Sequence, residues 1–313
     1  MTGEVYLAKD LKYGHDVVAK TEPSCVTPSE LEHEHRVLCQ LDGIIGIPKV
    51  HWFGYGTRCN TLILDRLGPS LEDVFNSCHR SFCLNTIASI ADQLVSLLSN
   101  TFTCVMIVVQ ICCLQRVHTR HIIHRDLQPG NILVGVGDKA HIIYLIDFSL
   151  SKQYRDPRTH IHIKPNDTSS FIGTLAFASI NSHLGLELGR RDDLESLVYL
   201  LIYLVRGSLP WVHLETMSAV LDMKRNTDEL CRELPGEFRR MLDYLHGLAF
   251  QARPDYDYLQ SLVRKLCLHS PETNIDLPDW LKNQPRTTTV HQLHVTDLAS
   301  LALTRVLQDE GDL

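Results

Sequence analysis

The feature that most restricts the fold is a polar stretch followed by a buried strand. The stretch reads His-Arg-Asp-Leu-Gln-Pro-Gly-Asn at residues 124–131, and the apolar run 142–146 ends in Asp147. A buried strand that ends in a carboxylate needs a reason, because an unpaired charge is costly to bury. Asp126, Asn131 and Asp147 provide two acids and an amide, the polar set that holds a metal-chelated triphosphate beside a hydroxyl. The sequence therefore predicts a site for phosphoryl transfer.

The triplet at residues 124–126 alone would not support this prediction. Most His-Arg-Asp triplets are solvated surface charge. The second segment favours a catalytic site, because it places Asp147 and Phe148 directly after the apolar run.

Both segments resemble the catalytic and metal-binding loops of eukaryotic-type protein kinases. Further stretches resemble the casein kinase I family within that group, and the similarity extends from about residue 3 to about residue 280. These stretches are residues 67–73 (Leu-Gly-Pro-Ser-Leu-Glu-Asp), 154–157 (Tyr-Arg-Asp-Pro), 179–181 (Ser-Ile-Asn), 190–196 (Arg-Arg-Asp-Asp-Leu-Glu-Ser) and 207–211 (Gly-Ser-Leu-Pro-Trp).

The resemblance implies an α+β, bilobal kinase-like fold within residues 1–280. A small antiparallel β lobe with one helix and an incomplete first strand would span residues 1–64, and residues 65–67 would form the hinge. A mainly helical large lobe would span residues 68–280, and a tail would follow at 281–313.

Hydrophobic periodicity predicts elements that suit such a fold. In the small lobe we expect an amphipathic helix at 29–41 and strands at 4–8, 17–20, 47–54 and 61–64. In the large lobe we expect helices at 71–76, 84–98 and 194–205, the last of them apolar enough to be a core element.

The resemblance also implies catalytic roles for matched residues. Asp126 would be the catalytic base or would orient the attacking hydroxyl. Lys20 would bind the α- and β-phosphates of ATP, and Glu34 would hold Lys20 by an ion pair. Asn131 and Asp147 would bind Mg²⁺. Without the resemblance, Lys20 would be interpreted as a solvated strand end and Glu34 as part of an exposed acidic helix face.

The implied nucleotide pocket involves a second set of residues. Gly3 and Val5 are what remains of the glycine-rich turn that covers the phosphates in the family. Leu64 would lie at the back of the adenine pocket, and the backbone of Asp65 and Leu67 would contact the adenine edge. The cofactors implied are ATP and Mg²⁺.

On the acceptor side, the resemblance implies that Thr174 bonds the catalytic acid and helps to orient the acceptor hydroxyl. Arg190, Lys164 and Lys224 are candidates to bind a phosphate or acidic group on the substrate. For Arg190 a salt-bridged helix start is an equal alternative. The implied substrates are serine and threonine residues of proteins.

The chain departs from the family at three positions of the site. The glycine-rich turn is missing before Gly3, either because the start is truncated or because the protein lacks this phosphate lid. Gln128 replaces a lysine that steadies the transferred phosphate, and the loss of one such contact commonly costs about 10²-fold in rate. Ser149 replaces the glycine of Asp-Phe-Gly, which narrows the backbone angles available there.

Residues 99–114 have no counterpart in the family. They are uncharged and rich in β-branched side chains, and their removal would join Leu98 to Gln115 in register with the family helix. An apolar insert in a packed helix has no obvious place to be buried. Two explanations stay open: a gene-model error such as a retained intron, or a genuine insertion that docks on the lobe or on a partner.

Composition restricts the class of protein. A length of 313 residues with 44% hydrophobic residues allows the large core of a bilobal enzyme, and a net charge of -7 argues against nucleic-acid binding. The 10 cysteines have irregular spacing, which indicates reduced thiols. We find no signal peptide and no apolar run of about 18 to 20 residues, so we expect a cytoplasmic or nuclear monomer without a membrane partner.

The sequence leaves three functions open. The first is an ATP-dependent serine/threonine protein kinase, which the retained Lys20, Asp126, Asn131 and Asp147 favour. The second is a catalytically impaired kinase-like domain that acts as a protein-binding scaffold, which the three departures favour. A small-molecule phosphotransferase is the third, and the kinase-like segment 174–181 argues against it.

Overall fold

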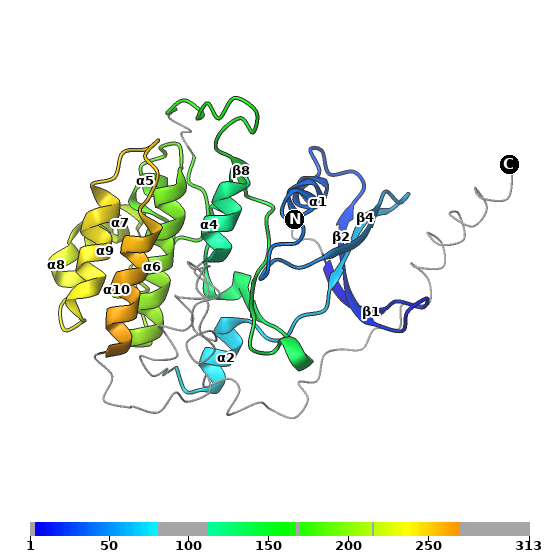
Figure 1. The fold of residues 1–313 in the computed structure, drawn as a ribbon, viewed down its shortest axis with the longest axis horizontal. Helices are drawn as coiled ribbons and strands as arrows, with labels where there is room; N and C mark the ends of the chain where they lie inside the picture. Colours follow the sequence, from blue (N-terminus) through cyan, green and yellow to red (C-terminus); the bar gives the residue numbers. More distant parts are fainter. Residues whose placement is uncertain (1–3, 81–111, 167–169, 215, 269–313) are drawn as a thin grey trace, which may run out of the picture. The chain divides into compact units, whose positions relative to one another are not determined.

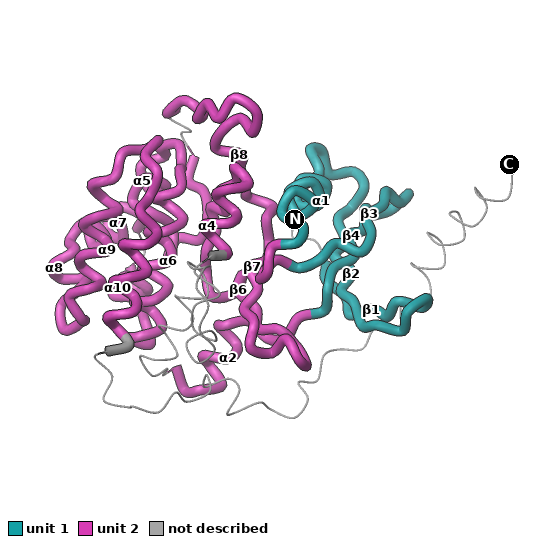
Figure 2. The backbone as a smooth tube through the Cα atoms, viewed as in Figure 1, with its two compact units in different colours: residues 1–43, 48–66, 285–313 teal, residues 44–47, 67–284 magenta. Residues whose placement is uncertain are grey.

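The computed structural model describes residues 4–80, 112–166, 170–214 and 216–268. The described chain divides into two compact units, which Figure 2 shows in two colours. Of the described residues, unit 1 contains those up to 43 and residues 48–66, and unit 2 contains residues 44–47 and those from Leu67 to Leu268. This division falls inside the stretch expected as the hinge. The expected helix 84–98 and the tail 281–313 lie outside the described residues.

Unit 1 is a four-stranded antiparallel sheet with one helix (Figure 1). The strands pair in the order β1-β2-β4-β3, with bounds β1 Glu4–Lys9, β2 Asp16–Pro23, β3 Val50–Gly54 and β4 Cys59–Asp65. Each strand overlaps one of the four predicted strands. The turn between β1 and β2 is closed by Asp10, whose carboxylate accepts a hydrogen bond from the Lys12 amide (2.7 Å).

The helix of unit 1, α1 (Glu30–Gln40), begins at a well-satisfied N-terminus. The Ser29 hydroxyl caps it by accepting from the Glu32 amide (3.0 Å). The buried carboxylate of Glu22 on β2 accepts from the amides of Glu30 (2.9 Å) and Leu31 (3.3 Å). A negative charge at this end also interacts favourably with the helix dipole. The sheet therefore fixes where α1 starts.

Unit 2 is mainly helical. Its helices are α2 (Leu71–Ser77), α4 (Cys112–Thr119), α5 (Ile180–His183), α6 (Arg190–Arg206), α7 (Met217–Arg225), α8 (Thr227–Leu230), α9 (Gly236–His246) and α10 (Tyr256–Leu268). Two antiparallel strand pairs accompany them: β5 (Ile122–Ile123) with β8 (Lys152–Gln153), and β6 (Ile132–Val134) with β7 (Ile143–Leu145). Short 3₁₀ turns lie at Pro129–Asn131 and Gly137–Lys139.

The centre of unit 2 is α6, in which every residue from 192 to 204 is buried. Helix α9 packs on α6, and α10 packs on α9, so the three lie side by side (Figure 1). A helix that is apolar on all sides has to be enclosed in this way. The predicted core helix at 194–205 is confirmed, and so is the α+β fold with an antiparallel sheet and a helical part.

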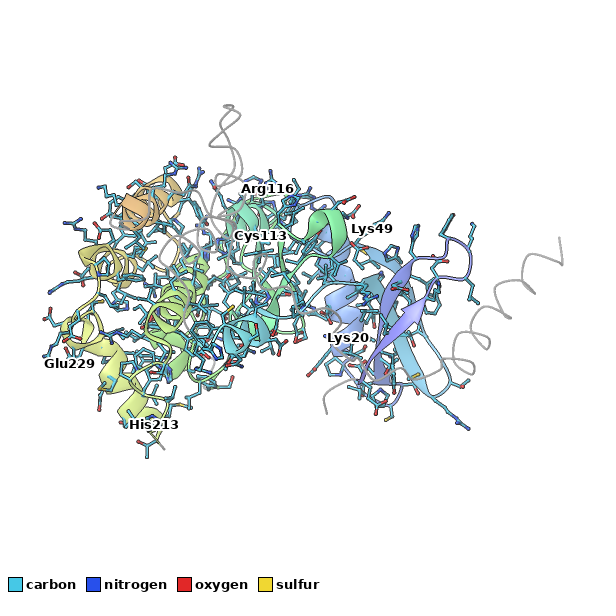
Figure 3. The ribbon with its side chains drawn as sticks, turned by 90° about the horizontal axis from the view of Figure 1, so that it is seen from below. Lys20, Lys49, Cys113, Arg116, His213 and Glu229 are labelled. Carbon is cyan, nitrogen blue, oxygen red and sulfur yellow. The ribbon has the colours of Figure 1, made fainter. Side chains whose placement is uncertain are left out.

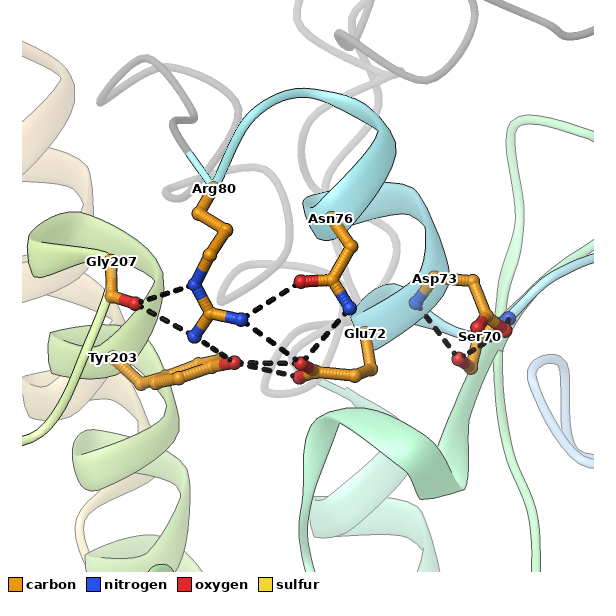
Figure 4. Close-up of polar contacts among 7 residues, drawn as sticks. All are labelled: Ser70, Glu72, Asp73, Asn76, Arg80, Tyr203 and Gly207. Atoms are coloured by element: carbon orange, nitrogen blue, oxygen red, sulfur yellow. Dashed lines mark hydrogen bonds and ion pairs between the residues drawn. The ribbon is translucent and has the colours of Figure 1, made fainter. Parts of the chain in front are cut away.

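A polar network joins α2 to the C-terminal end of α6 (Figure 4). The Arg80 guanidinium donates to the Gly207 carbonyl (2.8 Å), to the Tyr203 hydroxyl (2.6 Å) and to Asn76 Oδ1 (2.8 Å). The Tyr203 hydroxyl donates in turn to the Glu72 carboxylate (2.8 Å). A cation at a helix C-terminus is favourable, because the last carbonyls carry partial negative charge. Arg80 thus anchors α2 on the core helix.

Helix α4 changes the interpretation of residues 99–114. Cys113 and Leu114 lie in this helix and are buried, at 3% and 0% exposure, and the Cys113 thiol contacts the Gly46 carbonyl (3.7 Å). Figure 3 shows Cys113 and Arg116 on the same helix. For these last residues the expectation of no place to be buried was wrong, because they complete the core-facing side of α4. Residues 99–111 lie outside the described part.

In the described ranges, the helices are too short or too polar to span a membrane.

Candidate active site

A buried acid on α6, Asp193, holds the loop 124–131 by hydrogen bonds. Asp193 accepts hydrogen bonds from the backbone amides of His124 and Arg125, both at 2.8 Å, and from the His118 ring (2.9 Å). Burial acts to raise the pKa of Asp193, but the hydrogen bond and charge of His118, together with the charge and backbone amide of His124, lower the pKa below its usual value. Arg125 has φ of 72°, a strained angle for a residue other than glycine. The buried carboxylate stabilises this conformation and so fixes the loop.

The Asp126 carboxylate lies at the centre of the site. Its Oδ1 accepts from the Thr174 hydroxyl (2.7 Å). Its Oδ2 accepts from the side-chain amides of Gln128 and Asn131, both at 3.1 Å. The structure therefore brings three predicted site residues around a fourth, Asp126, and the three donors are all uncharged.

Gly173 allows Thr174 to approach this acid. Gly173 has φ of 95°, and a Cβ atom there would lie 2.6 Å from the carbonyl oxygen of Arg125. A side chain would be strained by the angle and would collide with the backbone of the loop. The glycine thus sets the close contact between the segment before Thr174 and the loop that carries Asp126.

Asp147 is tied to the same loop by hydrogen bonds of its neighbour. The Ile146 amide donates to the Asn131 carbonyl (3.0 Å), and the His124 ring donates to the Ile146 carbonyl (3.0 Å). Phe148 is fully buried and meets the His124 ring edge-on, with 4.8 Å between the ring centroids. Asp147 itself has φ of 62°, whereas Ser149 has a negative φ. The left-handed angle therefore falls on Asp147, and the serine after Phe148 is accommodated without strain.

The oxygens near this loop suit a hard cation. The side-chain amide nitrogen of Asn131 donates to Asp126, which leaves the Oδ1 atom of Asn131 as an oxygen that can bind a cation. Asp147 adds a carboxylate. Carboxylate and amide oxygens are the donors that Mg²⁺ prefers. Across the described ranges, the side chains of His, Cys, Asp and Glu do not gather in a group of three or more that could hold a metal. The donor set thus fits Mg²⁺ shared with phosphate oxygens better than a metal held by protein alone.

The predicted phosphate-binding pair lies in unit 1. Lys20, on β2 (Figure 3), forms an ion pair with Glu34 of α1, with 2.6 Å between Nζ and Oε2. The Glu34 side chain is 3% exposed and the Lys20 side chain 23%, so the acid is buried and the lysine is partly accessible to solvent. Val5 on β1 stands opposite Lys20 in the strand register and is exposed. The predicted ion pair is therefore formed, and phosphate binding by Lys20 stays a prediction.

The other residues of the predicted nucleotide pocket are divided between the units. Leu64 and Asp65 end β4 in unit 1, whereas Leu67 begins unit 2. The Asp65 amide donates to the Lys49 carbonyl (3.1 Å), and its carboxylate contacts the His51 ring (2.7 Å). Gly3 lies outside the described residues.

The three basic candidates for substrate binding differ in position. Lys164 is exposed. Arg190 is 7% exposed, donates to the carbonyls of Gln251 (2.9 Å) and Ala252 (3.2 Å), and stacks its guanidinium on the Tyr154 ring. Lys224 is completely buried. Neither interior residue presents its charge to a bound substrate, so of the three only Lys164 lies where a substrate could reach it.

Two acids of α6 hold segments of the site but were not among the predicted site residues. Asp193 holds the loop 124–131. Asp192 accepts from the Ser179 hydroxyl and the Asn181 amide, both at 2.8 Å, and from the Gly189 amide (2.7 Å). Burial and the charge of Glu195 raise the pKa of Asp192 to about 6. The available signal was the presence of adjacent acids on an otherwise apolar helix, since buried acids require partners.

Comparison with known families agrees with this geometry. The family model described as protein kinase domain matches residues 75–282, which is more than half of the chain. The match contains the loop 124–131, Asp147, Thr174 and the whole of α6. The chain belongs to the protein kinase domain family.

Proposed function

We propose that the chain is an ATP-dependent protein kinase that transfers the γ-phosphate to serine or threonine hydroxyls of proteins. The observation that carries this proposal is the Asp126 carboxylate, which is oriented by Thr174, Gln128 and Asn131. Membership of the protein kinase family supports ATP as phosphate donor and proteins as acceptors.

In this proposal Asp126 receives the proton of the acceptor hydroxyl. A carboxylate has about four lone-pair positions for hydrogen bonds. Thr174 occupies one position on Oδ1, and the two amides occupy both positions on Oδ2. The remaining position on Oδ1 is therefore available to an acceptor hydroxyl. Thr174 would orient that hydroxyl, because it shares the same oxygen atom.

Asn131 and Asp147 would hold Mg²⁺ through oxygen atoms. When bound, this ion neutralises charge on the phosphates of ATP. Lys20 would bind the α- and β-phosphates, and Glu34 would keep its ammonium in place. We also propose that Gly3, Val5, Leu64, Asp65 and Leu67 line the nucleotide pocket.

We further propose membership of the casein kinase I family. Two of the stretches that carry the resemblance are bonded to one another in unit 2: Ser179 and Asn181 donate to Asp192. The segment after Thr174 is thus hydrogen-bonded to the start of α6. In this proposal residues 1–280 are the kinase domain and 281–313 a tail, and the protein is a monomer of the cytoplasm or nucleus.

The second candidate is a scaffold with impaired catalysis, and Gln128 is the observation that favours it. Its neutral amide donates to Asp126 at 3.1 Å where the family has a lysine. A neutral amide provides a hydrogen bond but no charge to stabilise the transferred phosphate.

A binding and transfer experiment separates the two candidates. Thermal shift with Mg²⁺-ATP and radiolabelled transfer to casein would be measured for the wild type, Asp147→Ala and Asp126→Asn. We expect the wild type to bind and transfer, Asp147→Ala to lose both, and Asp126→Asn to bind but transfer at least about 10²-fold more slowly. Asp138→Ala, an exposed acid of the same unit, is the matched control. A folded wild type that binds Mg²⁺-ATP without transfer, or binds none, would support the scaffold instead.

A further inference from the structure

Lys224 is a completely buried lysine on α7. Its ammonium donates to the carbonyls of Leu175 (3.0 Å) and Ala178 (2.6 Å) and to the His183 ring (3.0 Å). An ammonium has three N–H donors, so all three are used. The rings of Tyr199 and Trp211 lie over the same nitrogen, with their centroids at 4.9 and 5.1 Å.

These contacts fix the segment that directly follows Thr174. The Lys224 ammonium binds the carbonyls at both ends of residues 175–178, and the Trp211 indole donates to the Ala176 carbonyl between them (2.9 Å). The amides of Phe177 and Ala178 donate back to the Thr174 carbonyl, at 2.9 and 2.8 Å. Thr174, which bonds Asp126, therefore lies in a short turn, and Lys224 and Trp211 hold the carbonyl groups of that turn by hydrogen bonds.

The charge on Lys224 is costly where it lies. Burial lowers the pKa of Lys224 to about 7, although the charge of Glu195 opposes this shift. Burial lowers the pKa of His183 to about 4, and the positive charge of Lys224 adds to this shift. The His183 ring is therefore neutral. Within the described ranges, Lys224 forms no ion pair with a carboxylate; the Glu195 carboxylate accepts from the Ile180 amide and the Tyr199 hydroxyl. A buried, unpaired ammonium is unfavourable unless its hydrogen bonds serve a purpose.

We propose that Lys224 is a positioning residue for the acceptor side of the site, and that it acts by holding residues 174–178 so that the Thr174 hydroxyl stays on Asp126. This inference rests on the proposed kinase function, because it concerns the orientation of the acceptor hydroxyl. It differs from the role of substrate contact that the sequence suggested for this lysine. Lys224 donates to backbone carbonyl groups of its own chain, so its ammonium is not available to a substrate side chain.

The test compares Lys224→Met with Arg225→Met. Methionine has a similar length without donors. Arg225 is the next residue of α7, is exposed, and among the described residues pairs with Asp222 of its own helix. In Lys224→Met we expect hydrogen exchange at the amides of Phe177 and Ala178 to be about tenfold faster or more, since charged hydrogen bonds to the segment are lost. Arg225→Met should leave exchange unchanged. This readout requires no catalytic activity.

The second readout is the split between kinetic constants. With a peptide acceptor, Lys224→Met should lower kcat by about tenfold or more and leave KM for ATP unchanged. Trp211→Phe, which keeps a ring but removes the N–H donor to Ala176, should change both readouts in the same direction by less. It also serves as the test variant if Lys224→Met does not fold.

The outcomes are distinct. Unchanged exchange at residues 177 and 178 in folded Lys224→Met, or in Trp211→Phe if the first variant does not fold, would overturn the proposal. A higher KM for acidic or phosphorylated peptides with unchanged exchange would also overturn it, in favour of a substrate contact. Faster exchange in a protein whose wild type transfers no phosphate would support Lys224 as the holder of this segment while refuting the proposed kinase activity.

Discussion

Replacing Gln128 by lysine should increase the rate of phosphate transfer. In the structure the Gln128 amide nitrogen lies 3.1 Å from Asp126 Oδ2, at the centre of the loop. A lysine at this position can place its ammonium within about 4 Å of the same carboxylate and, in the proposed kinase, near the phosphate to be transferred. The change therefore introduces a positive charge where negative charge must be stabilised.

The size of the effect follows from this geometry. Two unit charges about 4 Å apart interact by about 4 kcal/mol at an effective dielectric constant of about 20. Gln128 is only partly buried, so solvent reduces this value, and we expect a gain closer to that of one electrostatic contact. Such a contact is worth about 3 kcal/mol, or about 10²-fold in kcat.

The assay is radiolabelled transfer to casein at saturating ATP, with melting temperature measured on the same samples. Gln153→Lys is the matched control, because it adds the same charge at an exposed glutamine of β8. We expect Gln128→Lys to raise kcat about 10²-fold and Gln153→Lys to leave it unchanged. A folded Gln128→Lys variant that transfers at the wild-type rate, or no faster than Gln153→Lys, would refute the reasoning.

Two further predictions concern the segment around the acid. Thr174→Val removes a hydrogen bond to a charged group, worth about 1.5–3 kcal/mol, so kcat should fall by about 10- to 100-fold with KM for ATP unchanged; equal kcat would contradict the role of Thr174. Asp192 has a pKa of about 6, so the folded state binds more protons than the unfolded state between about pH 4 and 6, and its contribution to stability falls as pH rises through that window. Asp192→Asn should reduce this fall in urea denaturation measured from pH 4 to 7, and an unchanged pH dependence would contradict the assignment.

Much of the fold follows from patterns that are local in the chain. The strands of unit 1 and the core helix α6 lie where alternation and a continuous apolar run predicted them, because burial of one face or of all faces dictates those patterns. The burial of Cys113 and Leu114 could not be predicted in the same way. It depends on which helix faces the 44–47 turn, and this is decided by contacts between distant parts of the chain.

In the candidate site, too, some residues could be predicted from local sequence patterns, and others depend on contacts between distant parts of the chain. Asp126, Gln128, Asn131 and Thr174 could be predicted because their residue types and spacing repeat a known arrangement, and the structure brings them together. The place of basic residues such as Arg190 could not, since most arginines and lysines are exposed and only tertiary packing reveals the exceptions. The buried acids Asp192 and Asp193 differ in this respect, because two adjacent acids on an apolar helix are a local sign that buried partners are needed.

Helix α4 bears on the origin of residues 99–114. Its buried positions are occupied by Cys113 and Leu114. A shorter chain in which Leu98 is joined directly to Gln115 would bring Leu97 and Leu98 to these two positions. Both forms of the chain would then present apolar side chains to the same part of the core. The packing of α4 is therefore compatible with either origin of these 16 residues.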